Sequence, residues 1–450
     1  MCCARHRSMI TGSGHSVSTT CVTVALMQAS SSGRGRTNMR VVVVGGGIGG
    51  LALGAGLRRR GFEVAVFDRD TDVAATGGYH ITLDERALSA LEGLVEPAVM
   101  RRLLASGSAL RLRERDVFWD RRGRLLGYGP DLSGSTSVDV DRITLRTLLA
   151  EAVGDGLHLG RTVSGAGHDD SGAPRVLFTD GTAVPADLVV GADGTHSVIA
   201  RHLAGGPTNS PAGIIGFSGR TCLTDLSPVE QRRLGPRSGF AIGPRGTALY
   251  VGFLDPVGNA ALDAPDLRMS VTTGPTYIWG AMFTESAATE SLRELRDGQL
   301  QAALLGLFRR RGWAEHTLEV IARADSYSVG AFRFNAASTR ATDLAPWTAG
   351  RITALGDAVH ATPPTAGMGA GAAIRDAASL LEQLDVTADG TTTLTEAVNR
   401  FEAGMRQRGS EVLTLAMKTV RWILTTDTAL GAAATTVATP ILAAAARLRR

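Results

Sequence analysis

The stretch MRVVVVGGGIGG, residues 39–50, decides the fold of this 450-residue chain. Residues 41–44 are a short run of β-branched apolar side chains, which is typical of a central parallel strand buried on both faces. Residues 51–60, closed by Gly61, have the pattern of a helix, and residues 63–67 have that of a second strand. The stretch therefore predicts a strand–helix–strand unit with a glycine-rich turn.

The glycines of this turn have the spacing of a phosphate-binding loop. The first permits a tight turn, the second lets the backbone approach a pyrophosphate, and the third lets helix and strand pack closely. The pyrophosphate would lie at the helix N-terminus, which favours negative charge. Asp68 ends the second strand, where its carboxylate would bind an adenosine ribose and repel a 2′-phosphate, so the loop suits FAD or NAD and not NADP. The predicted contacts are Gly45, Gly47, Ile48, Gly50, Asp68 and Arg69.

The rest of the chain alternates between two patterns. Further helices are predicted at residues 83–94, 144–153 and 372–384, and buried strands at 188–190 and 351–355. A strand pair with an Asp180-Gly181 turn precedes the first of these strands. Residues 211–339 differ, because their alternating runs predict an antiparallel sheet interrupted by one helix. Those strands are expected at 239–242, 248–254 and 276–283, and the helix at 300–311.

Two further motifs each follow a predicted buried strand: LVVGADGTHSVIAR begins at Leu188, and RITALGDAVHATPPTAGMGAG begins at Arg351. With them the chain resembles the aromatic-hydroxylase-like flavoprotein monooxygenases, the group that includes salicylate and p-hydroxybenzoate hydroxylases and the tetracycline-inactivating monooxygenases. The resemblance runs from Met39 to about Arg408, with the glycine loop and both motifs in the family's order. It implies FAD as the bound cofactor.

The resemblance also implies roles for individual residues. Asp193 is similar to the residue that organises contacts near the pyrophosphate and the nicotinamide coenzyme, and Asp357 to the carboxylate that hydrogen-bonds the ribityl chain of FAD. Arg142 matches an arginine that the family directs at the cofactor; the alternative is a solvated arginine at a helix start. The other cofactor contacts implied by the resemblance are Gly194, Gly356, Gly367, Met368 and Gly369.

The loop after the Gly-Asp motif departs from the family's usual HPxxPxxGQGxN. Ala361 follows His360, Met368 stands between the glycines, and Gly371 takes the Asn position. Backbone contacts to FAD are compatible with these changes, whereas a side-chain amide contact to the flavin is lost. The small residues at 366–371 would let the backbone lie against a flat ring, and the helix that follows would stabilise negative charge there by about 0.3–2 kcal/mol.

Two residues are candidates for the substrate side. His80, in GGYHI at residues 77–81, resembles part of a family segment close to flavin and substrate. There it would orient or deprotonate a phenol; a structural, hydrogen-bonding histidine is the alternative. Arg220, in GFSGRTCL, resembles an arginine that many relatives hold near the flavin, and a plain surface arginine is the alternative.

These motifs together predict an FAD-dependent monooxygenase that uses NAD(P)H and dioxygen to hydroxylate or epoxidise a small hydrophobic substrate. Aromatic, polyketide, indole and terpenoid substrates are all compatible with the sequence, in secondary metabolism or detoxification. No second Gly-x-Gly-x-x-Gly unit follows a strand, so NAD(P)H is expected to bind transiently in a groove. A reductase on the same scaffold and a non-catalytic FAD-binding protein are the alternatives.

The expected fold class is α/β: a Rossmann-like FAD-binding domain of the glutathione-reductase type with an inserted antiparallel β-sheet and C-terminal helices. We expect these helices, within the apolar residues 413–448, to pack on the body and not to anchor in a membrane. The expected segments are a disordered tail or over-extended start (1–38), three FAD-binding parts (39–115, 142–210 and 340–400), two substrate-domain parts (116–141 and 211–339) and the C-terminal helices (401–450).

The composition limits which partners, metal sites and disulfides the protein is expected to have. The formal charge is only +4, and the arginines are scattered and not clustered, so no nucleic-acid partner is expected. Cys2, Cys3 and Cys21 lie in the tail and leave Cys222 alone in the body, which excludes a disulfide framework there. No metal-ligand spacing is found, and a cytoplasmic protein is expected. The oligomeric state is left open.

Overall fold

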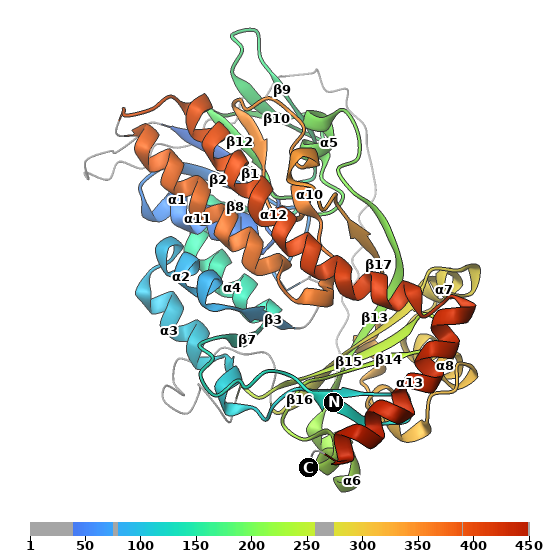
Figure 1. The fold of residues 1–450 in the computed structure, drawn as a ribbon. Helices are drawn as coiled ribbons and strands as arrows, with labels where there is room; N and C mark the ends of the chain where they lie inside the picture. Colours follow the sequence, from blue (N-terminus) through green and yellow to red (C-terminus); the bar gives the residue numbers. More distant parts are fainter. Residues whose placement is uncertain (1–38, 75–79, 257–273, 389, 449–450) are drawn as a thin grey trace, which may run out of the picture. The chain divides into compact units, whose positions relative to one another are not determined.

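The computed structural model describes residues 39–74, 80–256, 274–388 and 390–448. The tail predicted at 1–38 and the glycine segment at 77–79 lie outside them. Five parallel strands form one sheet in the order β18-β12-β1-β2-β8 (Figure 1). They are β1 (Arg40–Val44), β2 (Glu63–Phe67), β8 (Leu157–His158), β12 (Leu188–Gly191) and β18 (Ile352–Ala354).

The central strand β1 is buried on both faces, as its apolar run predicts. Val41 and Val43 belong to a core that includes the helices of one face, whereas Val42 and Val44 belong to a second core on the other face. The elements of the first face are α1 (Ile48–Arg59), α2 (Glu85–Leu94), α3 (Pro97–Ala105), α4 (Arg142–Val153) and α11 (Gly369–Ala388). Those of the second are β9 (Val163–His168), β10 (Pro174–Phe178), β11 (Ala183–Pro185) and α5 (Val198–Ala204).

The five predicted helices all begin two or three residues away from the predicted start, and α1 and α2 show why. Helix α1 already begins at Ile48, inside the glycine loop, because the close packing of α1 on α11 requires glycines in the helix itself. A Cβ atom at Gly49 would lie 2.9 Å from the Cβ of Ala373. Helix α2 begins later than predicted, since Leu83 ends a strand and Asp84 caps the helix by accepting a hydrogen bond from the Ala87 N–H.

The predicted β-rich insert forms a seven-stranded sheet in the order β17-β13-β16-β15-β14-β5-β6, antiparallel except for the β14–β5 pair. Its strands are β5 (Val117–Trp119), β6 (Leu125–Tyr128), β13 (Ser210–Cys222), β14 (Gly239–Gly243), β15 (Thr247–Leu254), β16 (Thr276–Thr284) and β17 (Gly330–Ala336). One face buries Phe217, Trp279 and Phe283 against α8 (Asp297–Arg310). The shorter helices of this part are α6 (Pro228–Leu234), α7 (Ala287–Ser291) and α9 (Glu319–Ala322).

A small sheet of order β3-β7-β4 lies between these two parts (Figure 1). Its strands, which the sequence pattern did not predict, are β3 (His80–Leu83), β7 (Val138–Asp141) and β4 (Ser108–Ala109). Strands β5 and β6 join the seven-stranded sheet, whereas β7 pairs only within the small sheet. The division of the chain into domains stays a prediction.

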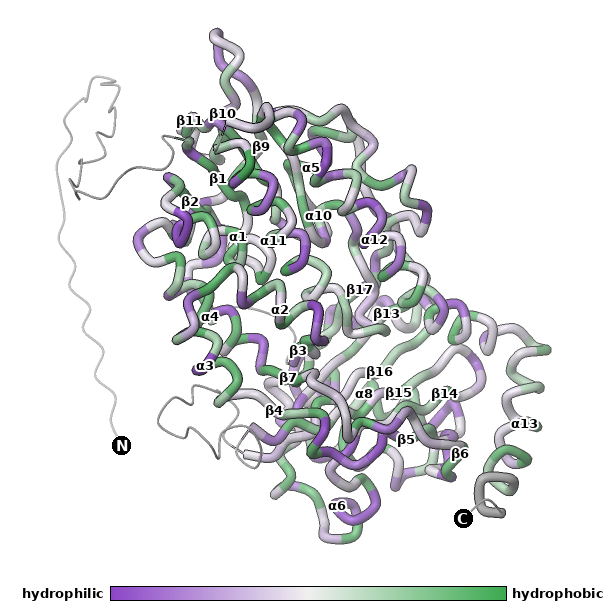
Figure 2. Tube along the Cα trace, turned by 60° about the vertical axis from the view of Figure 1, so that its left-hand side comes forward, coloured by the Kyte–Doolittle hydropathy of each residue, from purple (hydrophilic) through white to green (hydrophobic). Residues whose placement is uncertain are grey.

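The C-terminal helices are α12 (Leu394–Thr425) and α13 (Ala429–Leu448). Helix α12 packs on α11 and continues to the seven-stranded sheet, where Val420 and Ile423 share a core with Met282 (Figure 1). Helix α13 contacts β6 and exposes large apolar side chains such as Leu430 and Ile441; its hydropathy can be followed in Figure 2. Among the described residues, no helix has the length and apolar character needed to cross a membrane.

Candidate functional site

The glycine loop lies at the carboxyl end of β1, and its three glycines meet different surroundings. Gly45 has φ +109°, and a Cβ atom there would lie 2.4 Å from the Ala192 carbonyl oxygen. At Gly50 it would lie 2.0 Å from the Gly45 carbonyl oxygen. At Gly47 the nearest atom would be 4.0 Å away, and no side chain caps α1. The first and third glycines are thus required by packing, whereas the second leaves a helix N-terminus open to an anion.

Asp68 is held at the end of β2 by the backbone of the same loop. Its Oδ2 accepts a hydrogen bond from the Gly46 N–H, and its Oδ1 accepts one from the Asp70 N–H at 2.7 Å. Each carboxylate oxygen can accept a second hydrogen bond, so binding a ribose hydroxyl remains compatible with this geometry. Arg69, which follows it, is exposed. Its place among the cofactor contacts stays a prediction.

Arg146, which was not among the predicted site residues, supports the glycine loop. Its Nε donates to the Gly46 carbonyl oxygen at 2.8 Å, and its Nη2 lies 3.0 Å from Oδ2 of Asp70 and 3.6 Å from Oδ1 of Asp68. Only 4% of the Arg146 side chain is exposed. The available signal was an arginine among the apolar positions of α4, where an uncompensated charge would be costly.

The Asp193 motif adjoins the loop through Ala192. The Asp193 carboxylate accepts hydrogen bonds from the Ser197 hydroxyl and from the Val198 N–H, the latter at 2.7 Å, so both of its oxygens are engaged at the start of α5. Burial raises the pKa of this carboxyl. Gly194 has φ +77°, which turns the chain between strand and helix. The predicted role of Asp193 toward a nicotinamide coenzyme stays a prediction.

Asp357 is the first residue of α10 (Asp357–His360), and three separate segments meet around it. Its Oδ1 is buried and has no hydrogen-bond partner among the described residues. A Cβ atom at Gly369, the first residue of α11, would lie 3.7 Å from this oxygen. Burial raises the Asp357 pKa, against the opposing charges of His360 and of the half-buried Arg142 on α4. The structure therefore brings Arg142, Asp357 and the glycine loop at 367–369 together.

A buried His360–Asp376 pair, also absent from the sequence analysis, supports this turn. His360 Nε2 lies 2.6 Å from Oδ2 of Asp376, and both side chains are fully buried. The same Asp376 oxygen accepts the Gly356 N–H at 3.2 Å, and Oδ1 accepts from Arg408 Nε at 3.0 Å. Burial lowers the His360 pKa, but the Asp376 carboxylate outweighs it and raises the pKa overall.

The two substrate-side candidates lie on different sheets. His80 is on β3, and its ring stacks on that of Tyr250 on β15, with centroids 6.2 Å apart. Burial lowers the His80 pKa and raises that of Tyr250 to about 12, so at neutral pH the imidazole is neutral and the phenol protonated. Arg220 is on β13. It acts on Asp141, which pairs with His80 across β3 and β7. Burial raises the pKa of Asp141, and the positive charge of Arg220 partly offsets that rise.

Strand register shows which way Arg220 points. It is paired with Ile278, and Tyr250 with Gly280, so all four lie on one face of the seven-stranded sheet. The other face is the one packed against α8. Arg220 therefore faces the small sheet that carries His80.

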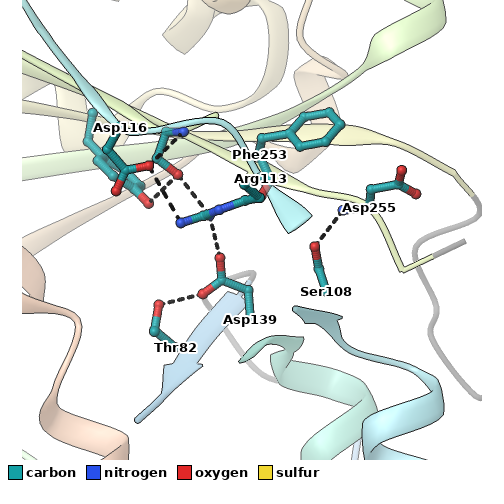
Figure 3. A network of polar contacts seen from close by, with 9 residues as sticks. Thr82, Ser108, Arg113, Asp116, Asp139, Phe253 and Asp255 are labelled. Carbon is teal, nitrogen blue, oxygen red and sulfur yellow. Dashed lines mark hydrogen bonds and ion pairs between the residues drawn. The ribbon is translucent and has the colours of Figure 1, made fainter. Parts of the chain in front are cut away.

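The Arg113–Asp139 ion pair fastens this small sheet to the seven-stranded sheet (Figure 3). Arg113 Nη1 lies 2.6 Å from Oδ2 of Asp139 on β7, 3.0 Å from Ser238 Oγ and 3.3 Å from the Phe253 carbonyl oxygen on β15. Thr82 on β3 donates to the other Asp139 oxygen. The Arg113 and Asp139 side chains are 4% and 2% exposed, so the surroundings of His80 depend on a buried pair.

A parallel sheet with an open glycine loop at its carboxyl edge defines a dinucleotide-binding protein. The family model described as FAD binding domain matches residues 38–244 and 311–413, and the chain belongs to this family. Zeaxanthin epoxidase from Spinacia oleracea is 28% identical over 77% of this chain and 48% of its own length. The 3-amino-4-hydroxybenzoate 2-monooxygenase of Streptomyces cremeus is 28% identical over 83% of this chain and 85% of its own.

Solved structures show the same fold. A putative FAD-containing monooxygenase from Photorhabdus luminescens has a TM-score of 0.71 at 20% identity, covering 85% of this chain and 98% of its own. Klebsiella pneumoniae HpxO complexed with FAD and uric acid has a TM-score of 0.68 at 23% identity, covering 90% and 92%. The chain spans about half the length of several curated relatives, zeaxanthin epoxidase among them.

The residues present fit FAD. The uncapped start of α1 offers N–H groups to a pyrophosphate, with clear space at Gly47. The buried Oδ1 of Asp357 lacks the donor that a ribityl hydroxyl would provide. The small residues from Gly367 to Gly371 leave room for a ring beside it.

Proposed function

We propose that this protein is an FAD-dependent monooxygenase that uses NAD(P)H and dioxygen to hydroxylate or epoxidise a small hydrophobic molecule. The observation that carries the proposal is the buried Oδ1 of Asp357, which has no partner among the described residues and lies beside the start of α11 in a chain of the FAD binding domain family. The monooxygenases among its relatives support the reaction class.

The chain's own residues would bind FAD and orient the substrate. Backbone N–H groups after Gly47 would hold the pyrophosphate, Asp68 the ribose and Asp357 the ribityl chain. Bound FAD would supply the electron transfer and the activation of dioxygen. The face of the seven-stranded sheet that carries Arg220 and Tyr250 would place the substrate. A neutral His80, held by its stacking on Tyr250, can accept a proton from a substrate hydroxyl.

The proposal includes an apolar substrate pocket lined from this sheet. Phe332 and Phe334 crowd the position of Gly216, where a Cβ atom would lie 2.4 Å from Phe334. Gly216 shares the face of Arg220, four residues further along β13. Phe334 is buried in the core shared with α12, whereas Phe332 is 37% exposed. An exposed aromatic ring with one guanidinium suits a flat apolar molecule that carries an acidic or polar group. A cytoplasmic location is part of the proposal, on the placement of the cysteines.

The test is oxygen incorporation. The purified protein should be yellow and oxidise NAD(P)H in air, and a substrate should accelerate this and gain one labelled atom from ¹⁸O₂. Accelerated coenzyme oxidation with a hydrogenated, oxygen-free product would favour the reductase alternative. A yellow protein that oxidises neither coenzyme with any candidate would favour the non-catalytic alternative.

A further inference from the structure

Two adjoining surface grooves share the side chains of Arg86 and Arg375. The larger, of about 620 Å³, is lined by α2 and α11 and by Arg408 of α12. The smaller, of about 410 Å³, is lined by the α12 segment from Ser410 to Leu415 and reaches Met368, between the glycines of the predicted flavin loop. One continuous surface thus leads from this loop to a set of arginines.

Two of these arginines, Arg375 and Arg86, are poorly neutralised. Arg375 makes no ion pair or hydrogen bond with any described residue, and its pKa is lowered by burial and then by the charges of Arg86 and Arg408. Within the described part of the chain, Arg86 is paired with Asp84 alone, at 3.5 Å, and its side chain is 60% exposed. Arg408 bonds Asp376 through Nε, while its Nη2 is buried without a partner among the described residues.

Charges of one sign gathered in a groove favour a ligand of the other sign. Four arginines line the larger groove against two exposed glutamates, Glu85 and Glu382, although one of the four, Arg60, is paired with Asp385 at 2.8 Å. Guanidinium groups bind phosphate through two parallel N–H donors, and a phosphate monoester carries a charge of about −1.5 to −2 at neutral pH. The groove therefore fits a phosphorylated ligand better than a carboxylate or a neutral one.

We propose that Arg86 and Arg375 bind the 2′-phosphate of NADPH, with the coenzyme lying along the two grooves toward the flavin loop. The inference rests on the proposed function, because NADPH is a reactant only there. The glycine loop cannot take this phosphate, since the Asp68 carboxylate would repel it. Arg375 lies six residues after Gly369 on α11, about 9 Å along the helix axis, which keeps the site close to the flavin loop.

The direct test is calorimetric titration of the FAD-loaded protein with adenosine 2′,5′-bisphosphate, AMP and inorganic phosphate. The bisphosphate should bind at least tenfold more tightly than AMP or phosphate. Arg375→Gln and Arg86→Gln should each remove most of that advantage. Arg101→Gln is the matched control, because Arg101 on α3 is exposed and its loss removes the same charge from the neighbouring surface. It should bind like the wild type.

Steady-state kinetics then separate this inference from the proposed function. Wild-type kcat/KM should be higher with NADPH than with NADH, and Arg375→Gln should raise the KM for NADPH about tenfold while leaving the NADH reaction unchanged. Equal use of both coenzymes, or equal affinity for phosphate and bisphosphate, would overturn the inference and leave the monooxygenase proposal standing. If neither coenzyme is oxidised, the proposed function fails, and the titration still decides whether the arginines bind the bisphosphate. Arg86→Gln, at an exposed position, keeps the test valid if Arg375→Gln does not fold.

Discussion

At the carboxyl edge of the parallel sheet the site is built from backbone, whereas between the small and seven-stranded sheets it is built from side chains. Gly45, Gly47 and Gly50 shape the first region by what they lack, and their spacing is local in the sequence. The second region depends on the Arg113–Asp139 pair and on His80 stacked against Tyr250, which join residues from four different strands and loops. Backbone requirements within a short segment produce a motif that can be recognised in the sequence. Contacts between side chains far apart in the chain produce no such motif.

The largest expected effect lies within the glycine loop itself. Gly50→Val should prevent stable folding, because its Cβ would overlap the Gly45 carbonyl oxygen at 2.0 Å. Gly47→Val meets no atom closer than 4.0 Å and should fold, yet purify colourless because the branched side chain fills the pyrophosphate position. Circular dichroism and the flavin absorbance measure the two outcomes. Full FAD content in a folded Gly47→Val protein would place the pyrophosphate elsewhere.

The buried ion pair of the second region should give the next largest effect. Asp139→Asn removes the 2.6 Å partner of the buried Arg113 guanidinium and leaves it Asp116, at 3.6 Å. Breaking a buried ion pair costs about 3–5 kcal/mol of unfolding free energy, and the remaining Asp116 carboxylate places the expected effect at the lower end of that range. Replacing both partners by apolar residues, as in Arg113→Met with Asp139→Leu, should recover most of this loss. Urea unfolding compares the variants. If Asp139→Asn were as stable as the wild type, this ion pair would not hold the two sheets together.

A smaller, pH-dependent effect is expected at His360. Its pKa is raised in the folded protein, so its stabilisation is complete below the unfolded value of about 6.5 and is lost as pH rises through the raised value. At pH 6 the unfolding free energy of the wild type should exceed that of His360→Gln by about 1.5–3 kcal/mol, the contribution of a charge-assisted hydrogen bond. Unfolding of both proteins at pH 6, 7, 8 and 9 measures the difference, which should shrink toward high pH. A difference that is constant or grows with pH would contradict the assigned charge.

The sequence predicts the cofactor half of this molecule well, for physical reasons. Strand β2 is as predicted, β1 is longer by Arg40, and the three motifs lie at strand ends on one sheet edge. The residues that support them were not predictable in the same way. Arg146 reaches back about 100 residues to Gly46, and Asp376 binds a histidine and an arginine from different helices. Such pairs are chosen by the tertiary fold, and an isolated arginine or aspartate gives no sign of its distant partner.

If Asp357 holds FAD beside the start of α11, FAD titration of the apo-protein should show it directly. Charge-assisted hydrogen bonds of this kind contribute about 1.5–3 kcal/mol, so Asp357→Ala should weaken FAD binding by roughly tenfold to a hundredfold. Asp357→Asn should have a milder effect, because an amide oxygen still accepts one such bond.

Stability provides the control for the same measurement. Oδ1 of Asp357 is buried without a partner among the described residues, although the Thr362 backbone and the charge of Arg142 also act on this carboxyl. Its removal should therefore change the melting temperature of the apo-protein much less than it changes FAD affinity. Asp170→Ala, at an exposed carboxylate, should alter neither quantity. We expect weaker FAD binding at little-changed apo-protein stability in Asp357→Ala. Wild-type FAD affinity in that variant would contradict it and would move the flavin away from Gly367 to Gly371.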